Sequence, residues 1–227
     1  MSETCKKLHE AFSALPRFGT GYVISQVPAN GIYIVFEKGE KAHDTDRIVG
    51  VGTHTGEGNL SQRLNEHLYT LNKDRSIFRK HIGRCLLAAE NNPLLEQWNL
   101  DTTSKAMREK HGKHIDTNAI AEIERRVSTY ITNSFTFTVI AVASKKDRLA
   151  LESELLSTIA SCADCKPSAQ WLGLHHPNAT IRDAGLWNIQ HVGDTPLSAE
   201  TVDVICSTCA ERVPTPEQSP RSRLNPR

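Results

Sequence analysis

The chain has 227 residues, 38% apolar and 23% charged, which suits one substantial globular domain or one domain with a large insertion. A formal charge of +1 excludes a protein that is basic over its whole surface, so binding to nucleic acid would need locally gathered positive charge. No apolar run approaches the ~20 residues that cross a bilayer, and the opening residues lack the apolar segment of a secretory signal. We therefore expect a cytoplasmic protein without membrane contact, in which the six cysteines are thiols or metal ligands.

The first part of the chain predicts a helical lead-in followed by a β-hairpin. Residues 1–30 are expected to hold a helix and a polar connection. The segments 31–39 (GIYIVFEKG) and 47–52 (RIVGVG) are rich in β-branched and aromatic residues, which favours strands. The polar stretch between them is typical of a hairpin loop.

Helices are expected between this hairpin and a third strand. Leucines recur at three- and four-residue steps and predict a helix with one apolar side; they are Leu60, Leu64, Leu68 and Leu71. Asp74 belongs to a residue type that caps helices, so a second helix is expected to begin there. Residues 85–133 are rich in charge and helix formers, which predicts a helical insertion.

The third strand is predicted at 134–143 (SFTFTVIAVA), and a helix with a continuous apolar stripe follows it. The stripe consists of Leu149, Leu151, Leu155, Leu156 and Ile159. This element order indicates the α+β class, with a small, mainly three-stranded mixed sheet in a domain that covers 31–192. A C-terminal helix is expected at 193–212, and the proline-rich residues 213–227 predict a disordered tail.

One carboxylate does not fit the helical pattern. Glu152 lies near the middle of the apolar stripe, so the helix would aim it at the core. An unpaired buried carboxylate would cost many kcal/mol, so it would be protonated, paired or bound to a metal ion. Arg63 and His67 lie one helical turn apart beside the leucines, and Arg63 is an alternative partner for Glu152 without any metal.

Two further polar residues, Tyr33 in the first strand and Asn188 in an apolar segment, complete a set that suits phosphodiester hydrolysis. A carboxylate can hold a divalent cation that polarises a phosphoryl oxygen. An arginine can stabilise charge on the phosphate. A phenol or an imidazole can position or deprotonate the attacking water.

In its order and spacing this set resembles the GIY-YIG nuclease superfamily. The resemblance rests on GIY at 31–33, the glycine-ended strand at 50–52, Arg63, the leucine-rich segment around Glu152, and Asn188. It implies a compact nuclease fold in a bacterial branch that carries a large helical insertion. DNA is the partner that the resemblance implies, and a divalent metal ion is the implied cofactor.

The resemblance also implies roles for individual residues. Tyr33 would position or deprotonate water, Arg63 would contact the scissile phosphate, and Glu152 would bind Mg²⁺ or Mn²⁺. His67 is similar to a histidine that acts as a base in some restriction-type members. Asn188 matches an asparagine close to the site. These expectations describe a metal-dependent DNA endonuclease.

The sequence departs from the family pattern at the second motif, where Gly50 stands in place of a tyrosine. Tyr22 and His54 are candidate substitutes for the missing phenol. The alternative to an enzyme is a non-catalytic nucleic-acid-binding or protein-binding module on the same fold. A third class is a structural protein stabilised by zinc, and the sequence does not decide between a monomer and a homodimer.

Basic segments supply candidate DNA contacts, with an ordinary solvated surface as the equal alternative. The candidates are His54, Arg75, Arg79, Lys80, Arg84, Lys145 and Lys146. Two CxxC pairs could also hold a structural zinc ion through four thiolates, with free thiols as the alternative. The candidate zinc ligands are Cys162, Cys165, Cys206 and Cys209.

Overall fold

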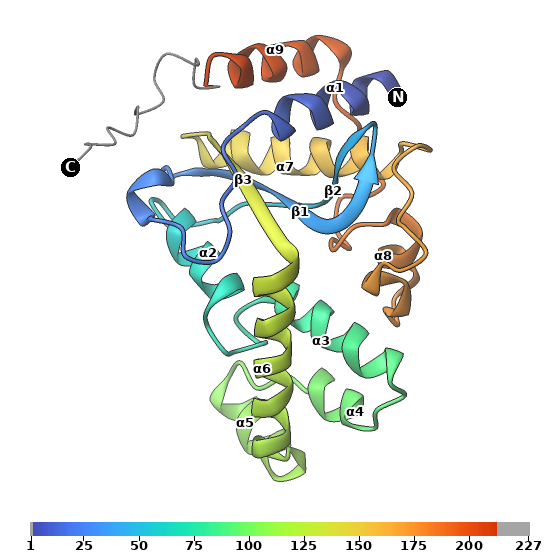
Figure 1. Cartoon of the computed structure of the whole chain (residues 1–227). Coiled ribbons are helices and arrows are strands. Elements are labelled where there is room, and N and C mark those ends of the chain that lie inside the picture. Colours follow the sequence, from blue (N-terminus) through green and yellow to red (C-terminus); the bar gives the residue numbers. More distant parts are fainter. Residues whose placement is uncertain (1, 213–227) are drawn as a thin grey trace, which may run out of the picture.

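The computed structural model describes residues 2–212, and Figure 1 shows how helices surround a three-stranded sheet. The strands are β1 (Gly31–Ala42), β2 (Thr45–Gly52) and β3 (Phe135–Ala141). The helices are α1 (Ser2–Ser13), α2 (Leu60–Leu68), α3 (Ile77–Ala89), α4 (Leu94–Asn99), α5 (Lys105–His111), α6 (Thr117–Ser134), α7 (Lys145–Ala160), α8 (Ala179–Ala184) and α9 (Ala199–Ala210). Short 3-10 turns lie at η1 (Ile24–Gln26), η2 (Gly112–His114) and η3 (Leu172–His175).

The sheet has the order β2-β1-β3, and both strand pairs are antiparallel. The predicted α+β class with three strands is confirmed, although the sheet is antiparallel throughout rather than mixed. β1 is the central strand, and residues 31–37 are buried because side chains cover both faces of the sheet. The central strand therefore contacts both core clusters of the domain.

Both hairpin strands are longer than predicted because the turn between them contains only two residues. Ala42 pairs with Thr45 across the turn, and the φ angles of His43 and Asp44 are 51° and 61°. Two consecutive left-handed residues form a type I′ turn, whose twist matches that of the flanking strands. The turn brings the His43 ring to 5.0 Å from the ring of His9 in α1.

Alternating side chains of β1 divide the core into two clusters. Ile32, Ile34 and Phe36 belong to the cluster that also contains buried residues of α1, α7 and α9. Tyr33 and Val35 point the other way, into a cluster with α2, α3 and α6. In Figure 1, α1, α7 and α9 gather at one side of the sheet, while α3 to α6 extend away from it. Helix α6 leads directly into β3, so this helical extension is anchored to the sheet.

Three details of the predicted helices differ from the structure. Helix α3 begins later than expected because Ser76, rather than Asp74, caps it, with Ser76 Oγ accepting the Arg79 N–H at 3.2 Å. Leu71 lies beyond the end of α2 and is 57% exposed. Leu149 is 39% exposed, so the apolar stripe of α7 begins after it.

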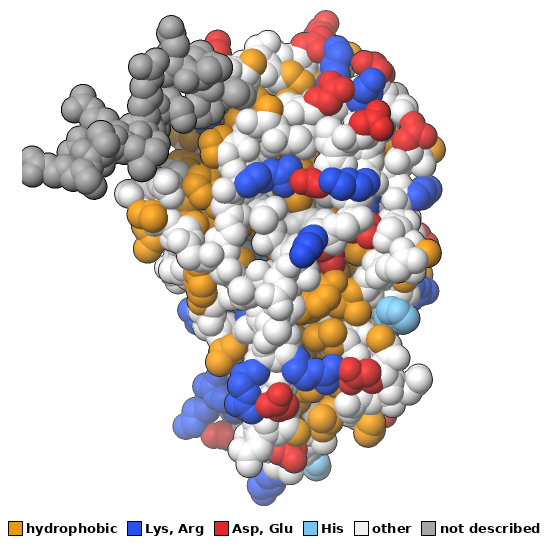
Figure 2. Space-filling model, viewed as in Figure 1, with side chains coloured by type: hydrophobic (Ala, Val, Ile, Leu, Met, Phe, Trp, Pro, Cys, Tyr) orange, Lys and Arg blue, Asp and Glu red, His pale blue; other side chains and the backbone are white. Residues whose placement is uncertain are grey.

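Helices α4, α5 and α6 occupy the predicted helical insertion, and α9 lies within the predicted C-terminal helix. None of the helices among residues 2–212 combines the length and apolar character that crossing a membrane requires. The predicted disordered tail at 213–227 lies outside the described residues. On the face shown in Figure 2, basic and acidic side chains lie interspersed, which agrees with the small net charge.

A buried histidine pair joins α3 to the segment before α8. His81 Nδ1 lies 2.9 Å from His176 Nε2, and His176 Nδ1 accepts the Asn178 N–H at 2.9 Å. His176 therefore carries its proton on Nε2 and donates it to His81, which also lies 3.2 Å from Arg84 Nη1. Burial, reinforced by neighbouring charges such as Arg84, lowers the pKa of His81 to about 3 and that of His176 to about 4.

This pair predicts how stability responds to acid. We expect the contribution of this pair to the free energy of unfolding to be level above about pH 6.5 and to fall as the pH drops from there toward 4. In that window the unfolded chain binds more protons, because its histidines titrate near 6.5 while His81 and His176 stay neutral in the folded chain. Each unit of pKa shift corresponds to roughly 1.4 kcal/mol, so the loss amounts to several kcal/mol.

Denaturant unfolding over a series of pH values measures this loss. His176→Gln should flatten the acid slope, whereas replacement of the exposed neighbour, His175→Gln, should leave it unchanged. An acid slope that is the same in His176→Gln as in the original chain would contradict the assignment.

Candidate active site

One cavity, of about 190 Å³, is lined by all five residues that the sequence selects as catalytic candidates, Tyr33, Arg63, His67, Glu152 and Asn188. They come from β1, α2, α7 and the segment that follows α8. The fold thus brings together side chains that are far apart along the chain. A larger cavity of about 460 Å³ lies within the helical extension, and none of the five lines it.

Tyr33, His67 and Ser76 form a chain of short hydrogen bonds at the floor of this cavity. The Tyr33 hydroxyl lies 2.7 Å from His67 Nε2, and His67 Nδ1 lies 2.6 Å from Ser76 Oγ. Burial raises the pKa of Tyr33 to about 12 and lowers that of His67 well below its ordinary value. The phenol is therefore protonated and the imidazole neutral, so Tyr33 donates to Nε2 and Nδ1–H donates to Ser76.

Arg63 lies one turn before His67 on α2, and its guanidinium is held by two acceptors. Nη1 donates to Glu66 Oε2 at 3.2 Å and to the Arg75 carbonyl at 3.0 Å. The positive charge of Arg63 opposes the burial that raises the pKa of the Tyr33 phenol. Arg63 is thus a fixed cation that partly offsets the effect of burial on the Tyr33 phenol.

A second depression, of about 350 Å³, adjoins the cavity and contains Thr53, Arg63 and Glu66 in its wall. Thr53 and Arg63 line both spaces. The guanidinium therefore stands where an extended ligand could pass from one space into the other.

Glu152 reaches the cavity from α7. The apolar side chains of α7 pack in the core cluster shared with α1 and α9, on the opposite face of β1 from Tyr33. Burial raises the pKa of this carboxyl, while His191, the Thr53 backbone amide and Arg63 oppose the rise. Among residues 2–212 the ion-pair partner of Arg63 is Glu66, so the metal-free pairing of Arg63 with Glu152 is not formed. Burial therefore desolvates this carboxylate, and a cation would relieve the burial cost.

Asn188 is held against the edge of β2 through both ends of its side-chain amide. Oδ1 accepts the Val51 N–H at 3.2 Å, and Nδ2 donates to the Val51 carbonyl at 2.9 Å. The preceding residue, Trp187, donates its backbone N–H to the Val49 carbonyl at 2.7 Å. The segment therefore lies along β2 and fixes the amide at the rim of the cavity.

Two motif glycines are explained by close contacts across the sheet. A Cβ at Gly31 would lie 2.2 Å from the Ile140 carbonyl oxygen of β3. A Cβ at Gly52 would lie 2.2 Å from the Tyr33 hydroxyl, because Gly52 pairs with Tyr33 and the phenol ring lies across it. Gly52 is thus the position that allows Tyr33 to reach His67.

Gly52→Ala is expected to lower the free energy of unfolding by about 1–3 kcal/mol, because the added methyl group must displace a buried, hydrogen-bonded ring. The matched control is Gly112→Ala, at a position with a φ of −58° and open space around it, where a change within ~0.5 kcal/mol is expected. Denaturant unfolding of the two variants measures the difference. Equal stability of Gly52→Ala and the original chain would show that the close contact carries no cost.

The two candidate substitutes for the missing motif tyrosine do not line this cavity. The Tyr22 hydroxyl lies 3.4 Å from both the Ser61 carbonyl and Asn65 Oδ1. His54 is buried, and its Nε2 accepts the Gly31 N–H at 3.3 Å, so it supports the start of β1. Gly50 itself lines the cavity, and a Cβ there would lie 3.1 Å from Asn188 Oδ1.

The candidate DNA-contacting residues separate into buried and exposed groups. The prediction for Arg79 was wrong, because it is fully buried and its Nη2 lies 2.8 Å from Glu124 Oε2. Lys80 is mostly buried and forms an ion pair with Asp74 at 3.1 Å. His54 is buried, and its two ring nitrogens contact the backbone of Gly31 and Gly56, so it is not placed to contact DNA.

The remaining basic candidates reach solvent. Arg75 is 59% exposed and pairs with Glu66, and Arg84 is partly buried with Nε donating to Asn99. Lys145 and Lys146 are exposed at the start of α7. Arg75 lies just before α3, whereas Lys145 and Lys146 lie at the start of α7, so the exposed cations do not follow one helix face.

The two CxxC pairs do not form one four-thiolate group in the structure. Within residues 2–212, Cys165 instead joins Cys5, His9 and His43 as a group that could hold a metal ion. Cys206 contacts the Lys7 carbonyl. The predicted zinc ligand set is therefore corrected.

Sequence reasoning missed Ser76, whose contact with His67 depends on how α3 packs against α2. It also missed Cys5 and His9, although their i, i+4 spacing on one helix was a visible signal. His43 had no such signal, because only the hairpin turn brings it to α1.

Comparison with known proteins gives a match to a family model. Residues 3–213 match the family model described as a GIY-YIG domain. No curated protein gave a significant match, and neither did any solved structure.

Proposed function

This chain belongs to the GIY-YIG domain family, and from that premise we propose that it is a divalent-metal-dependent DNA endonuclease that hydrolyses phosphodiester bonds. The observation that carries the proposal is the convergence of Tyr33, Arg63, His67, Glu152 and Asn188 on one cavity. Four of them supply chemical groups that phosphodiester hydrolysis needs, namely Tyr33, Arg63, His67 and Glu152. We place the chain in a reducing, cytoplasmic environment, in which the six cysteines would be thiols or metal ligands.

The donor set at the cavity fits a hard divalent cation. Glu152 offers a desolvated carboxylate without an ion-pair partner among the described residues. Magnesium is commonly bound through one or two carboxylates with water and substrate phosphate as the other ligands, so a single glutamate is sufficient. When bound, Mg²⁺ or Mn²⁺ would polarise a phosphoryl oxygen and stabilise the charge that develops on it.

Arg63 supplies the second charge-stabilising group. Its guanidinium is already oriented by Glu66 and the Arg75 carbonyl, so little reorganisation is needed when a phosphate binds. A guanidinium fork matches the geometry of phosphate oxygens. We assign Arg63 to the scissile phosphate because it lines both the cavity and the adjoining depression.

Tyr33 and His67 would move the proton of the attacking water. As the water oxygen bonds to phosphorus, Tyr33 takes the water proton while its own hydroxyl proton passes to His67 Nε2. The bond from phosphorus to the leaving oxygen breaks, and that oxygen takes a proton from solvent. Ser76 holds the imidazole with Nε2 facing Tyr33. The positive charge of Arg63 disfavours protonation of His67. A bound phosphate carries negative charge and would offset this effect.

Arg75, Lys145 and Lys146 are the exposed cations that we assign to the DNA backbone. Their contacts would be independent of sequence and weakened by salt. The alternative function, a non-catalytic binding module, is favoured by Gly50, which leaves the second motif without its phenol.

A cleavage assay separates the two functions. The full chain is incubated with supercoiled plasmid and with branched DNA in Mg²⁺, Mn²⁺ or EDTA. Nicking that requires the divalent ion is the expected result. Binding of DNA without cleavage under all metal conditions would overturn the enzyme proposal in favour of the binding module.

A further inference from the structure

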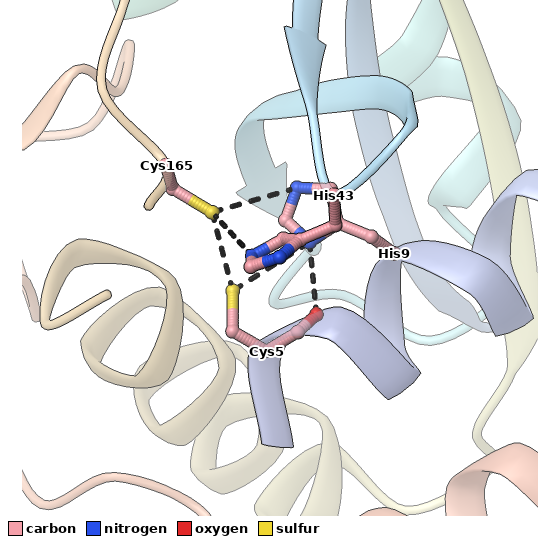
Figure 3. A group of neighbouring side chains, drawn as sticks. All are labelled: Cys5, His9, His43 and Cys165. Atoms are coloured by element: carbon pink, nitrogen blue, oxygen red, sulfur yellow. Dashed lines mark hydrogen bonds between the residues drawn. The ribbon is translucent and has the colours of Figure 1, made fainter. Parts of the chain in front are cut away.

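Four side chains that could ligate a metal ion converge at the opposite side of the sheet from the candidate active site. Cys5 and His9 come from α1, His43 comes from the hairpin turn, and Cys165 follows α7. Figure 3 shows the two thiols and two imidazoles pointing toward one another. Their candidate ligand atoms all lie within 4.8 Å of one another.

The separations are close to the edges of a tetrahedral zinc site. Zn–S bonds of about 2.3 Å and Zn–N bonds of about 2.0–2.1 Å place neighbouring ligand atoms roughly 3.3–3.8 Å apart. Cys5 Sγ lies 3.3 Å from Cys165 Sγ, and Cys165 Sγ lies 3.2 Å from His43 Nε2. His9 Nε2 lies 3.9 Å from Cys165 Sγ. Small movements of these side chains would complete the coordination sphere.

The surroundings fit a closed, structural site. Cys5 and His9 are fully buried, Cys165 is 3% exposed, and His43 is partly buried. His9 Nδ1 lies 2.9 Å from the Cys5 carbonyl, the kind of backbone contact that leaves Nε2 of a ligating histidine free for the metal. Nε2 accepts the Ile48 N–H at 3.1 Å, so metal binding would replace that hydrogen bond.

We propose that Cys5, His9, His43 and Cys165 bind one structural Zn²⁺ ion. Two thiolates and two imidazoles are a ligand set that zinc prefers, and all four positions are filled by protein. Binding releases the two thiol protons to solvent. The ion would join α1, the hairpin tip and the end of α7, three segments that are distant in the chain.

The site is separate from the proposed Mg²⁺ or Mn²⁺ site and does not depend on nuclease activity. It ties together the hairpin, whose first strand carries Tyr33, and helix α7, which carries Glu152. Cys162 Sγ lies 3.5 Å from His43 Nε2 and is the neighbouring thiol that could compete with His9 for the fourth position.

The test is elemental analysis of the full chain, purified under reducing conditions with Zn²⁺ supplied during expression. One zinc per chain is expected, and Co²⁺ substitution should give the thiolate charge-transfer and tetrahedral d–d absorption of a Cys₂His₂ site. Cys165→Ser and His43→Asn should weaken zinc binding at least tenfold. Cys206→Ser, Cys209→Ser and Glu152→Gln are matched controls that should keep the zinc.

Because a ligand variant could fail to fold, the original chain is also tested directly. A strong chelator should remove the zinc and lower the melting temperature, and Zn²⁺ but not Mg²⁺ should restore it. A chain that binds no zinc under these conditions would overturn the proposal. Loss of zinc in Cys206→Ser would also overturn the proposal. A disulfide between Cys5 and Cys165 would overturn it as well, and a thiol assay would detect it because two of the six thiols would be missing.

The fourth ligand is tested by one pair of variants. His9→Asn should lose zinc affinity while Cys162→Ser retains it. The reverse result would overturn the assignment of His9.

Discussion

Glu152→Gln is expected to reduce DNA cleavage at least ~10³-fold while the folded chain stays as stable as the original or becomes more stable. The amide cannot hold a divalent cation as a carboxylate does, so the charge stabilisation at the phosphate is lost. Stability should not fall, because burial raises the pKa of Glu152 in the folded chain. A carboxyl whose pKa is raised by folding destabilises the native state above that pKa, and the neutral amide removes this cost.

Plasmid nicking in Mg²⁺ and thermal unfolding of the same preparation measure the two quantities. Glu154→Gln is the matched control, because Glu154 lies two residues further along α7 and does not line the cavity. Cleavage by Glu152→Gln at the original rate would remove Glu152 from the mechanism. A large loss of stability would instead indicate a structural role for the carboxylate.

Tyr33→Phe is expected to reduce the cleavage rate by about 10²–10⁴-fold with little change in DNA affinity, because it removes a proton-transfer group and keeps the ring. The ring would still lie across Gly52, so the strand pairing should survive. His67 Nε2 would lose its 2.7 Å hydrogen bond, which costs roughly 1–3 kcal/mol of stability if no water replaces it.

Single-turnover cleavage and DNA-binding isotherms separate the rate from the affinity. Tyr22→Phe is the control, since the Tyr22 phenol lies outside the cavity and makes only 3.4 Å contacts. Cleavage that is unimpaired in Tyr33→Phe, or equally impaired in Tyr22→Phe, would refute the proposed proton path.

Local patterns in the sequence were sufficient for the sheet and most helices. The β-branched run at 31–39 and the leucine spacing after Leu60 reflect one-sided burial, which the folded elements preserve. The length of the hairpin was underestimated, because His43 and Asp44 are not the glycine-containing pair typical of a two-residue turn. No residue type in the sequence marks the type I′ turn at His43 and Asp44. The pairing of the two flanking strands must therefore place the turn there.

The candidate site could be found because two of its residues, Arg63 and His67, share one helix face and Glu152 interrupts an apolar stripe. A polar residue that interrupts an apolar pattern can be recognised in the sequence alone. The acidic residue that pairs with a given arginine or lysine cannot be recognised in this way. Arg79 resembles its exposed neighbours in the sequence, and only the packing of α3 against α6 gives it Glu124.

The hydrogen bonds at the sheet margins also bear on how copies of the chain could associate. On the outer side of β2, Asn188 and Trp187 occupy backbone groups of Val51 and Val49. On the outer side of β3, Phe18 and Phe137 exchange backbone hydrogen bonds, both of 2.8 Å. A strand from a second molecule would have to displace one of these segments before it could extend the sheet. Any homodimer is therefore expected to form through side-chain surfaces rather than by strand addition.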